Sequence, residues 1–398
     1  MADLLHGIGL LAAALVLVGA ACVGLSARAV RRLLRPAPAL PATLPTSILK
    51  PLHGAEPGLA ANLAATLAQH PAPAFEVLFA VRDAADPAAA IAAAAMAAAP
   101  GTPARLVIGA RLHGPNRKVS QLVNLEALAR HPILVVADAD MRVPPGWLAA
   151  VTAPLADPRV GAVTCLYRGQ AADPCPAAHP LWSRLAALGI DWHFLPNAAL
   201  GEGLGLARGC YGATIALRTE TLARIGGFQA LAGLLADDHA LGEAVRRLGL
   251  RVVLAPVLPA HVMAEPGLGA LLRHELRWAR TLRLLDFPGY CGLGLTHPLP
   301  AGLLAAALAP APWGGLALAV ALAARLGLAL AVDRALGQSG TLGRLALLPL
   351  RDLLSFTIWV AGLLRGTVVW QGRRYRMDAR GRMAETRRPD PIPTSLRP

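Results

Sequence analysis

The apolar run from Leu4 to Leu25 limits what this chain can fold into more than any other feature, because a helix needs about 20 such residues to cross a bilayer. Four basic residues follow the run: Arg28, Arg31, Arg32 and Arg35. Because basic residues stay on the cytoplasmic side of a span, the N-terminus is expected outside. A cleaved signal peptide would begin with a basic segment, whereas only Asp3 and His6 precede the run. We therefore predict an uncleaved anchor over residues 1–27.

The composition indicates a soluble domain joined to membrane helices. Hydrophobic residues make up 55% of the 398, and the mean hydropathy of +0.49 is high for a soluble enzyme. The net charge of +14 would fit a nucleic-acid binder, but the arginines gather beside apolar runs and an aromatic content of 4% leaves little to stack on bases. The five cysteines show no paired spacing. We expect no nucleic-acid partner, no disulfide framework and no zinc site.

Short β-rich runs alternate with helical ones after a basic, proline-rich linker over residues 28–45. Strands are expected in SILKPL, FEVLFAVRD, ARLVIGA and ILVVADAD, with helices between them. This alternation favours a mainly parallel sheet covered by helices on both faces. We predict an α/β domain over residues 46–290, with its ligand beyond the carboxyl ends of the strands.

Two further apolar segments follow this domain. The first, Leu299–Val332, is broken by prolines, and the second, Leu345–Leu364, is interrupted only by one Arg-Asp pair. Membrane segments are therefore expected over residues 291–366, and an arginine-rich cytoplasmic tail over residues 367–398. An outer N-terminus and an inner tail require an odd number of crossings, so one proline-broken piece would be re-entrant or interfacial.

Acidic residues follow two of the predicted strands. Asp83 ends FEVLFAVRD, and Asp138 and Asp140 end ILVVADAD, so the three carboxylates are expected to meet at one edge of the sheet. Carboxylate oxygens suit a hard divalent cation that bridges a diphosphate, whereas a single Asp after a strand is commonly a turn residue. Three acids, including an Asp-x-Asp pair, favour a site for a metal ion and a nucleotide.

A second acidic pair precedes an amphipathic helix. Asp237 and Asp238 stand in LLADDHALGEAVRRLG. Aspartate is favoured at helix N-caps, so one of the two is expected to cap the helix while the other faces the cleft. Transfer from a nucleoside diphosphate to a hydroxyl requires such a base.

An interfacial helix is predicted over residues 271–285, in RHELRWARTLR. Its arginines could lie along a membrane surface or reach phosphates: Arg273, Arg277 and Arg280. In this helix, His274 is expected at the surface.

In their order and spacing, these motifs resemble the inverting glycosyltransferases of family 2 type, in the ceramide-glucosyltransferase-like branch that includes the hopanoid-pathway N-acetylglucosaminyltransferases. The resemblance covers most of the chain. It is carried by SILKPLHGAEPGL, AVRDAADPA, HGPNRKVSQL, DADMRVPPGWL, TCLYRG, LADDHALG, HELRWARTLR and WQGRRYRM. The hopanoid-type members are similar to this chain especially in PLHGAEP, HGPNRK, TCLYRG and HELRWART.

For the donor side, the resemblance implies a GT-A fold, a Rossmann-like and mainly parallel α/β sheet with helices on both faces, flanked by N-terminal and C-terminal transmembrane helices. It implies that Asp83 contacts the nucleotide base and that Lys118 lies along the donor pocket. Asp138 and Asp140 would hold UDP and its Mg²⁺ or Mn²⁺.

For the acceptor side, the resemblance implies that Asp238 is the catalytic base, with Asp237 as the neighbouring acid. Arg277 and Trp278 match an Arg-Trp pair near the diphosphate and the acceptor. His274 departs from the pattern, because Gln or Arg usually opens this motif. The departure leaves the role of that position open and argues against a processive polysaccharide synthase, in which Gln is expected.

The activity implied is inverting transfer from a UDP-sugar, foremost UDP-N-acetylglucosamine, to a lipid hydroxyl such as that of bacteriohopanetetrol, at the cytoplasmic face of the inner membrane. Transfer of glucose from UDP-glucose to ceramide is the nearest alternative. A non-catalytic membrane protein, such as a transporter subunit, is the second alternative and would place ionisable residues along its spans. The candidates for such residues are Arg325, Asp333, Arg351 and Asp352. No sequence feature indicates an oligomeric state.

Overall fold

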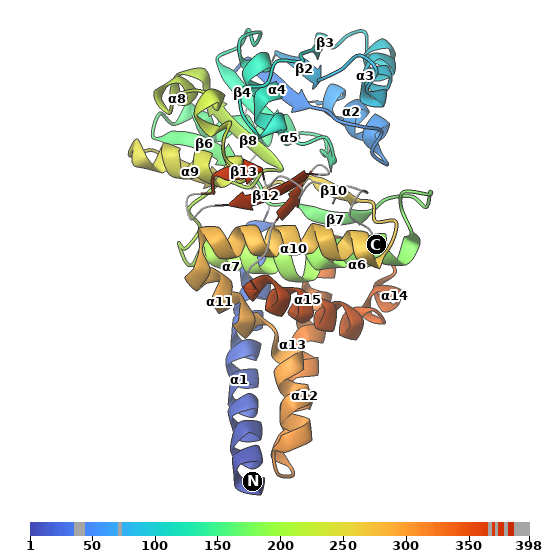
Figure 1. Cartoon of the computed structure of the whole chain (residues 1–398), viewed down its shortest axis with the longest axis vertical. Helices are drawn as coiled ribbons and strands as arrows, with labels where there is room; N and C mark the ends of the chain where they lie inside the picture. Colours follow the sequence, from blue (N-terminus) through green and yellow to red (C-terminus); the bar gives the residue numbers. More distant parts are fainter. Residues whose placement is uncertain (36–43, 71–73, 365–367, 371–372, 378–380, 386–398) are drawn as a thin grey trace, which may run out of the picture.

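The computed structural model describes residues 1–35, 44–70, 74–364, 368–370, 373–377 and 381–385. An α/β domain stands on a layer of helices, and long helices extend from that layer on the opposite side (Figure 1). Residues 36–43 of the predicted linker, and residues 367, 371–372, 378–380 and 386–398 of the predicted tail, lie outside the described residues.

A seven-stranded sheet forms the centre of the α/β domain. Its strands are β1 (Thr46–Pro51), β2 (Phe75–Val81), β3 (Ala104–Ile108), β4 (Ile133–Ala137), β6 (Val160–Thr164), β8 (Thr214–Arg218) and β9 (Arg251–Leu254). They lie in the order β3-β2-β1-β4-β8-β6-β9, and within the described residues β8 alone runs antiparallel to its neighbours. The predicted mainly parallel sheet is confirmed.

Helices cover both faces of this sheet. One face packs against α2 (Leu59–Leu67), α3 (Pro87–Ala98) and α5 (Trp147–Thr152), and the other against α4 (Arg117–Glu126), α8 (Thr219–Arg224) and α9 (Asp237–Arg247). Ile48 belongs to the first core and its neighbour Leu49 to the second, because successive strand residues point to opposite faces. A strand buried on both faces explains why these runs are mainly apolar and do not alternate between apolar and polar residues.

Two small sheets complete the domain. β5 (Met141–Arg142), β10 (Ala260–Met263) and β7 (Arg168–Ala171) form one of them, with β10 in the middle. The other consists of β11 (Val368–Trp370), β12 (Arg373–Met377) and β13 (Met383–Glu385). Short 3-10 helices, η1 (Ala153–Ala156) and η3 (Phe228–Leu231), connect elements of the domain.

The long helices pack into a bundle of α1 (Ala2–Leu33), α12 (Pro298–Leu308) and α13 (Trp313–Ala335) (Figure 1). α1 and α13 are long and apolar enough to cross a membrane, and the bent pair Phe287–Thr296 and Pro298–Leu308, with an angle of 57° between them, gives a third candidate span. α1 continues beyond the predicted anchor boundary at residue 27, since arginines are compatible with a helix and no proline occurs before Pro36.

A layer of helices lies between the domain and the bundle (Figure 1). It contains α6 (Pro180–Gly189), η2 (Ile190–Phe194), α7 (Leu195–Gly203), α10 (Leu268–Leu285), α11 (Phe287–Leu293), η4 (Gly294–Thr296), α14 (Thr341–Leu345) and α15 (Leu348–Leu363). α10 contains the predicted interfacial helix 271–285.

Ion pairs hold helices of this layer to one another and to α13. Arg325, Asp333, Arg351 and Asp352, the four candidates named from the sequence, each have a partner at 2.7 to 3.0 Å, in the pairs Arg325–Asp352, Arg344–Asp333 and Arg351–Glu275. Charges buried between helices are costly unless they are paired, so these ion pairs hold neighbouring helices together.

Replacing Arg351 with Met should lower the free energy of unfolding by about 3 kcal/mol, because it would leave the largely buried Glu275 carboxylate, 12% exposed, without its partner. The Arg351 side chain is only 1% exposed, and its two terminal nitrogens lie 2.8 and 2.7 Å from the Glu275 oxygens. Thermal unfolding in detergent would measure the loss. Adding Glu275→Gln to this variant should restore part of the stability, and a single variant as stable as the wild type would contradict the assignment.

Candidate active site

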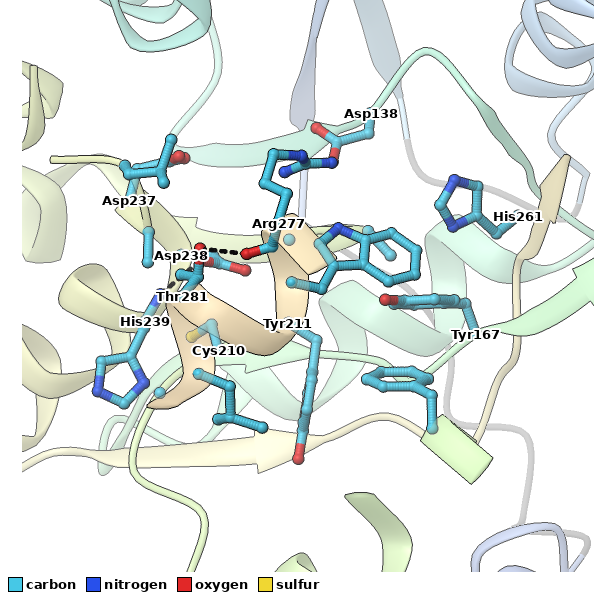
Figure 2. Close-up of a pocket in the computed structure, with 18 of the residues that line it drawn as sticks. Asp138, Tyr167, Cys210, Tyr211, Asp237, Asp238, His239, His261, Arg277 and Thr281 are labelled. Atoms are coloured by element: carbon cyan, nitrogen blue, oxygen red, sulfur yellow. Dashed lines mark hydrogen bonds between the residues drawn. The ribbon is translucent and has the colours of Figure 1, made fainter. Parts of the chain in front are cut away.

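The carboxyl ends of the central strands open into a cavity of about 2060 Å³. Residues from the domain and from α10 line it, and Figure 2 shows part of this lining. Every site residue predicted from the sequence is among them: Asp83, Lys118, Asp138, Asp140, Asp237, Asp238, His274, Arg277 and Trp278. The fold thus brings residues from widely separated motifs to one place.

Asp138 follows β4 and pairs with Lys118. The Lys118 Nζ atom lies 2.6 Å from Asp138 Oδ1 and 3.8 Å from Asp237 Oδ2. Asn116 caps the N-terminus of α4 through the Val119 N–H and so fixes the start of the helix that carries Lys118. Burial lowers the pKa of Lys118, but the two carboxylates outweigh it and hold that pKa above its usual range. A permanent positive charge therefore lies between the two acids.

Asp140 is paired with His261, a residue that the sequence analysis missed. The His261 Nε2 atom lies 3.0 Å from Asp140 Oδ2. Pairing of β10 with β5 brings the two together, because the Val262 N–H donates to the Asp140 carbonyl at 2.9 Å. Burial raises the pKa of Asp140, but the charge and hydrogen bond of His261 outweigh it and hold that pKa below its usual range. Asp140 is accordingly ionised.

Lys50 was also missed as a site residue. It lies in β1, is fully buried, and donates from Nζ to the Asp138 carbonyl at 2.7 Å. Burial lowers the pKa of Lys50 to about 8, against the opposing charges of Asp140 and Asp138. A lysine inside a uniformly buried strand was the available signal, because such a charge requires partners.

The Asp138-Ala139-Asp140 turn could hold a metal ion only if a substrate supplied further ligands. Among the described residues, no three His, Cys, Asp or Glu side chains are grouped to hold an ion. Asp83, Asp138 and Asp140 line one cavity at the same edge of the sheet, as expected, but β1 lies between β2 and β4, and Asp83 is exposed and accepts from the Ala85 N–H at 3.0 Å. Asp140 Oδ1, however, is buried without a hydrogen-bond partner in the described part of the chain. An ion held by one or two carboxylates takes its other ligands from phosphates and water, which suits this oxygen.

Asp237 and Asp238 lie in the first turn of α9. Neither caps the helix, contrary to expectation, because Ala236 occupies the N-cap. Asp237 accepts from Asn116 Nδ2 at 3.3 Å, and Asp238 accepts from the His239 N–H at 2.8 Å. Burial, followed by the charge of Asp237, raises the pKa of Asp238 to about 6. Asp238 can therefore gain and lose a proton near neutral pH.

α10 lines the cavity from the side of the helical layer. Arg277 extends from it with its guanidinium group toward Asp138 (Figure 2). The Trp278 ring packs against His274, with ring centroids 4.4 Å apart, and against His261 at 5.8 Å. His274 is not a free surface residue as predicted, because its Nδ1 atom lies 2.8 Å from the buried Glu265 carboxylate. In place of the expected Gln or Arg, it supports the Trp278 ring.

Tyr167 is a further lining residue without a role predicted from the sequence. It lies in TCLYRG, stacks on Phe194 with ring centroids 4.4 Å apart, and meets the His261 ring edge-on at 5.4 Å. Because TCLYRG is one of the motifs that carry the family resemblance, its presence there was the only sequence indication that Tyr167 belongs to the site. An aromatic side chain in a short segment is usually a core residue.

Comparisons with known proteins agree with this geometry. A family model described as glycosyl transferase family 21 matches residues 10–383. A mannosyltransferase from Pyrobaculum calidifontis, solved with GDP-Man and Mn²⁺, has 22% sequence identity and a TM-score of 0.50, and the match covers 90% of this chain and 97% of that one. GalNAc-T7, solved with UDP, GalNAc and Mn²⁺, has 11% identity over 66% of this chain and 52% of that one, and its TM-score of 0.38 carries no weight. The first likeness confirms the predicted GT-A type of fold.

Proposed function

The chain belongs to glycosyl transferase family 21 and is therefore a glycosyltransferase, and from that premise we propose that it moves a sugar from a UDP-sugar to the hydroxyl group of a membrane lipid. One observation supports this proposal above all. The cavity that contains the Asp-x-Asp turn and Asp238 extends to Cys22 on α1, one of the apolar helices long enough to span a membrane. Family membership also sets aside the alternative of a non-catalytic membrane protein.

In this proposal, the donor lies between the sheet edge and α10. Asp83 contacts the nucleotide base, Lys118 lies along the donor, and Asp138 and Asp140 hold UDP with Mg²⁺ or Mn²⁺. When bound, the metal ion neutralises the leaving diphosphate, a contribution on the order of several kcal/mol. Arg277 adds positive charge from α10, with its guanidinium group toward Asp138.

Asp238 is the proposed base. It takes the proton of the acceptor hydroxyl while the oxygen attacks the anomeric carbon from the face opposite UDP, and the bond to the diphosphate breaks. An α-linked donor then yields a β-glycoside. Asp237 helps to set the pKa of this base, and Trp278, supported by His274, forms the adjacent wall.

We also propose a topology. Residues 1–27 anchor the chain, residues 46–290 form a cytoplasmic catalytic domain, and residues 291–366 contain the other membrane segments of an inner-membrane protein. α1, the bent pair and α13 would then supply three crossings. An odd number agrees with an outer N-terminus and an arginine-rich tail, residues 367–398, in the cytoplasm.

For the substrates, we propose UDP-N-acetylglucosamine and bacteriohopanetetrol, on the strength of the motifs shared with the hopanoid-type members. Membranes that contain the protein, incubated with both compounds and Mn²⁺, should yield a lipid heavier by one N-acetylhexosamine in mass spectrometry. UDP-glucose and ceramide are the matched second donor and acceptor, and membranes without the protein are the control. Glucosylated ceramide without the hopanoid product would establish the alternative instead.

A further inference from the structure

The cavity continues past the catalytic residues toward the membrane helices. Residues of α10, α11, η2 and α7 line it there. Its far end is lined by Cys22 on α1 and by Thr296 on η4. α7 packs directly against α1, so this end lies beside the bundle. The catalytic centre and the membrane helices therefore share one continuous space.

Large apolar side chains line this cavity and are exposed as well. Leu204 and Leu206 follow α7 and are 59% and 64% exposed, and Phe287, at the start of α11, is 54% exposed. Exposure of such side chains to water costs free energy, and a group of them usually marks contact with a partner or a membrane. We call these three residues the apolar rim of the cavity.

We propose that the apolar rim is the entrance through which the lipid acceptor passes sideways from the bilayer into the active site, an inference that rests on the proposed function. The hydroxyl end of the lipid reaches Asp238, while its apolar part stays against Leu204, Leu206 and Phe287 and leads back into the hydrocarbon. The occupant is thus a single-headed membrane lipid with a free hydroxyl group.

The residues at the two ends of the cavity favour a lipid entrance at the apolar rim. At the donor end, the lining carries Arg111, Lys118 and Asp83, which suit a charged nucleotide. Toward the membrane helices, the lining residues Glu275 and Arg351 neutralise each other in a pair with two short contacts, and the exposed Arg208 and Asp286 beside the rim carry opposite charges. An apolar ligand is accommodated beside such a closed pair, whereas a soluble polar acceptor would leave the rim in contact with water.

Gly201 offers a direct test, because it lies in α7 and lines the cavity, and a Cβ atom there would meet no atom within 4 Å. Gly201→Phe should therefore place a ring in the passage with no strain at its Cβ atom. The acceptor is whichever of bacteriohopanetetrol and ceramide the wild type glycosylates, presented in phospholipid vesicles to the full chain. The KM for this acceptor should rise about tenfold or more, while calorimetric affinity for UDP and the melting temperature stay unchanged.

Gly315→Phe is the matched control. Gly315 is also a helical glycine at which a Cβ atom would meet no atom within 4 Å, but it lies on α13 away from the cavity. Its acceptor KM should equal that of the wild type. An unchanged KM in Gly201→Phe, or an equal rise in both variants, would overturn the proposed entrance.

A second variant avoids any dependence on the packing of α7. Leu206→Glu places a charge on an exposed rim position and should also raise the acceptor KM, since a charge opposes contact with hydrocarbon. An unchanged KM in this variant would contradict the entrance. A wild-type protein that glycosylates neither lipid would instead refute the proposed function, so the two failures can be told apart.

Discussion

Replacing Asp238 with Asn is expected to lower sugar transfer by about 100- to 10,000-fold, the usual contribution of a general base, while UDP binding stays close to that of the wild type. Asparagine has nearly the same shape and can still accept from the His239 N–H, but it cannot take up the acceptor proton. Turnover with a labelled UDP-sugar and calorimetric titration of UDP would separate the two effects. If the variant kept full turnover, Asp238 would not be the base.

The pH dependence of the wild type provides an independent check on this base. Because a protonated carboxyl group cannot accept a proton, kcat/KM should fall as the pH decreases through about 6, the raised pKa of Asp238. Burial is the main cause of that pKa and the charge of Asp237 comes next. Asp237→Asn should therefore move the acid limb to lower pH, and an unmoved limb would mean that another group controls it.

The donor turn could be predicted from the sequence because its parts are contiguous. β4 is an apolar run of five buried residues, and Asp138 and Asp140 follow it directly, so the strand and its carboxylates are visible in one short stretch. The same holds for Asp237 and Asp238 at the start of α9. A short stretch of sequence was sufficient to predict a site residue wherever a single strand or helix both carries and positions its side chain.

The partners of that turn could not be predicted in the same way. His261 reaches Asp140 only because β10 pairs with β5, which joins segments far apart in the chain. The position of Asp83 depends on strand order, since β1 lies between β2 and β4 and thereby keeps this carboxylate away from the turn. Neither contact between distant segments leaves a local pattern in the sequence, whereas both decide which groups surround the Asp138-Ala139-Asp140 turn.

The effect of Asp140 on donor binding provides the sharpest contrast with Asp238. Asp140→Asn should weaken UDP binding in the presence of Mn²⁺ by about 10- to 100-fold, because the buried Oδ1 atom without a partner would lose the charge that suits a divalent ion. The rate of sugar transfer should fall together with the affinity for UDP. Titration of UDP with Mn²⁺ and again with EDTA would measure the change.

The chelator separates a metal ligand from a residue that only packs in the site. For the wild type and for Asp238→Asn, EDTA should weaken UDP binding strongly, whereas for Asp140→Asn it should have little further effect, since the metal-dependent part is already lost. Asp83→Asn is a useful comparison, because that exposed residue lies apart from the turn and its loss should leave the response to EDTA intact. If Asp140→Asn bound UDP as tightly as the wild type and kept the full response to EDTA, the metal would have to be held elsewhere in the cavity, and Asp140 would serve chiefly to keep His261 and Lys50 in place.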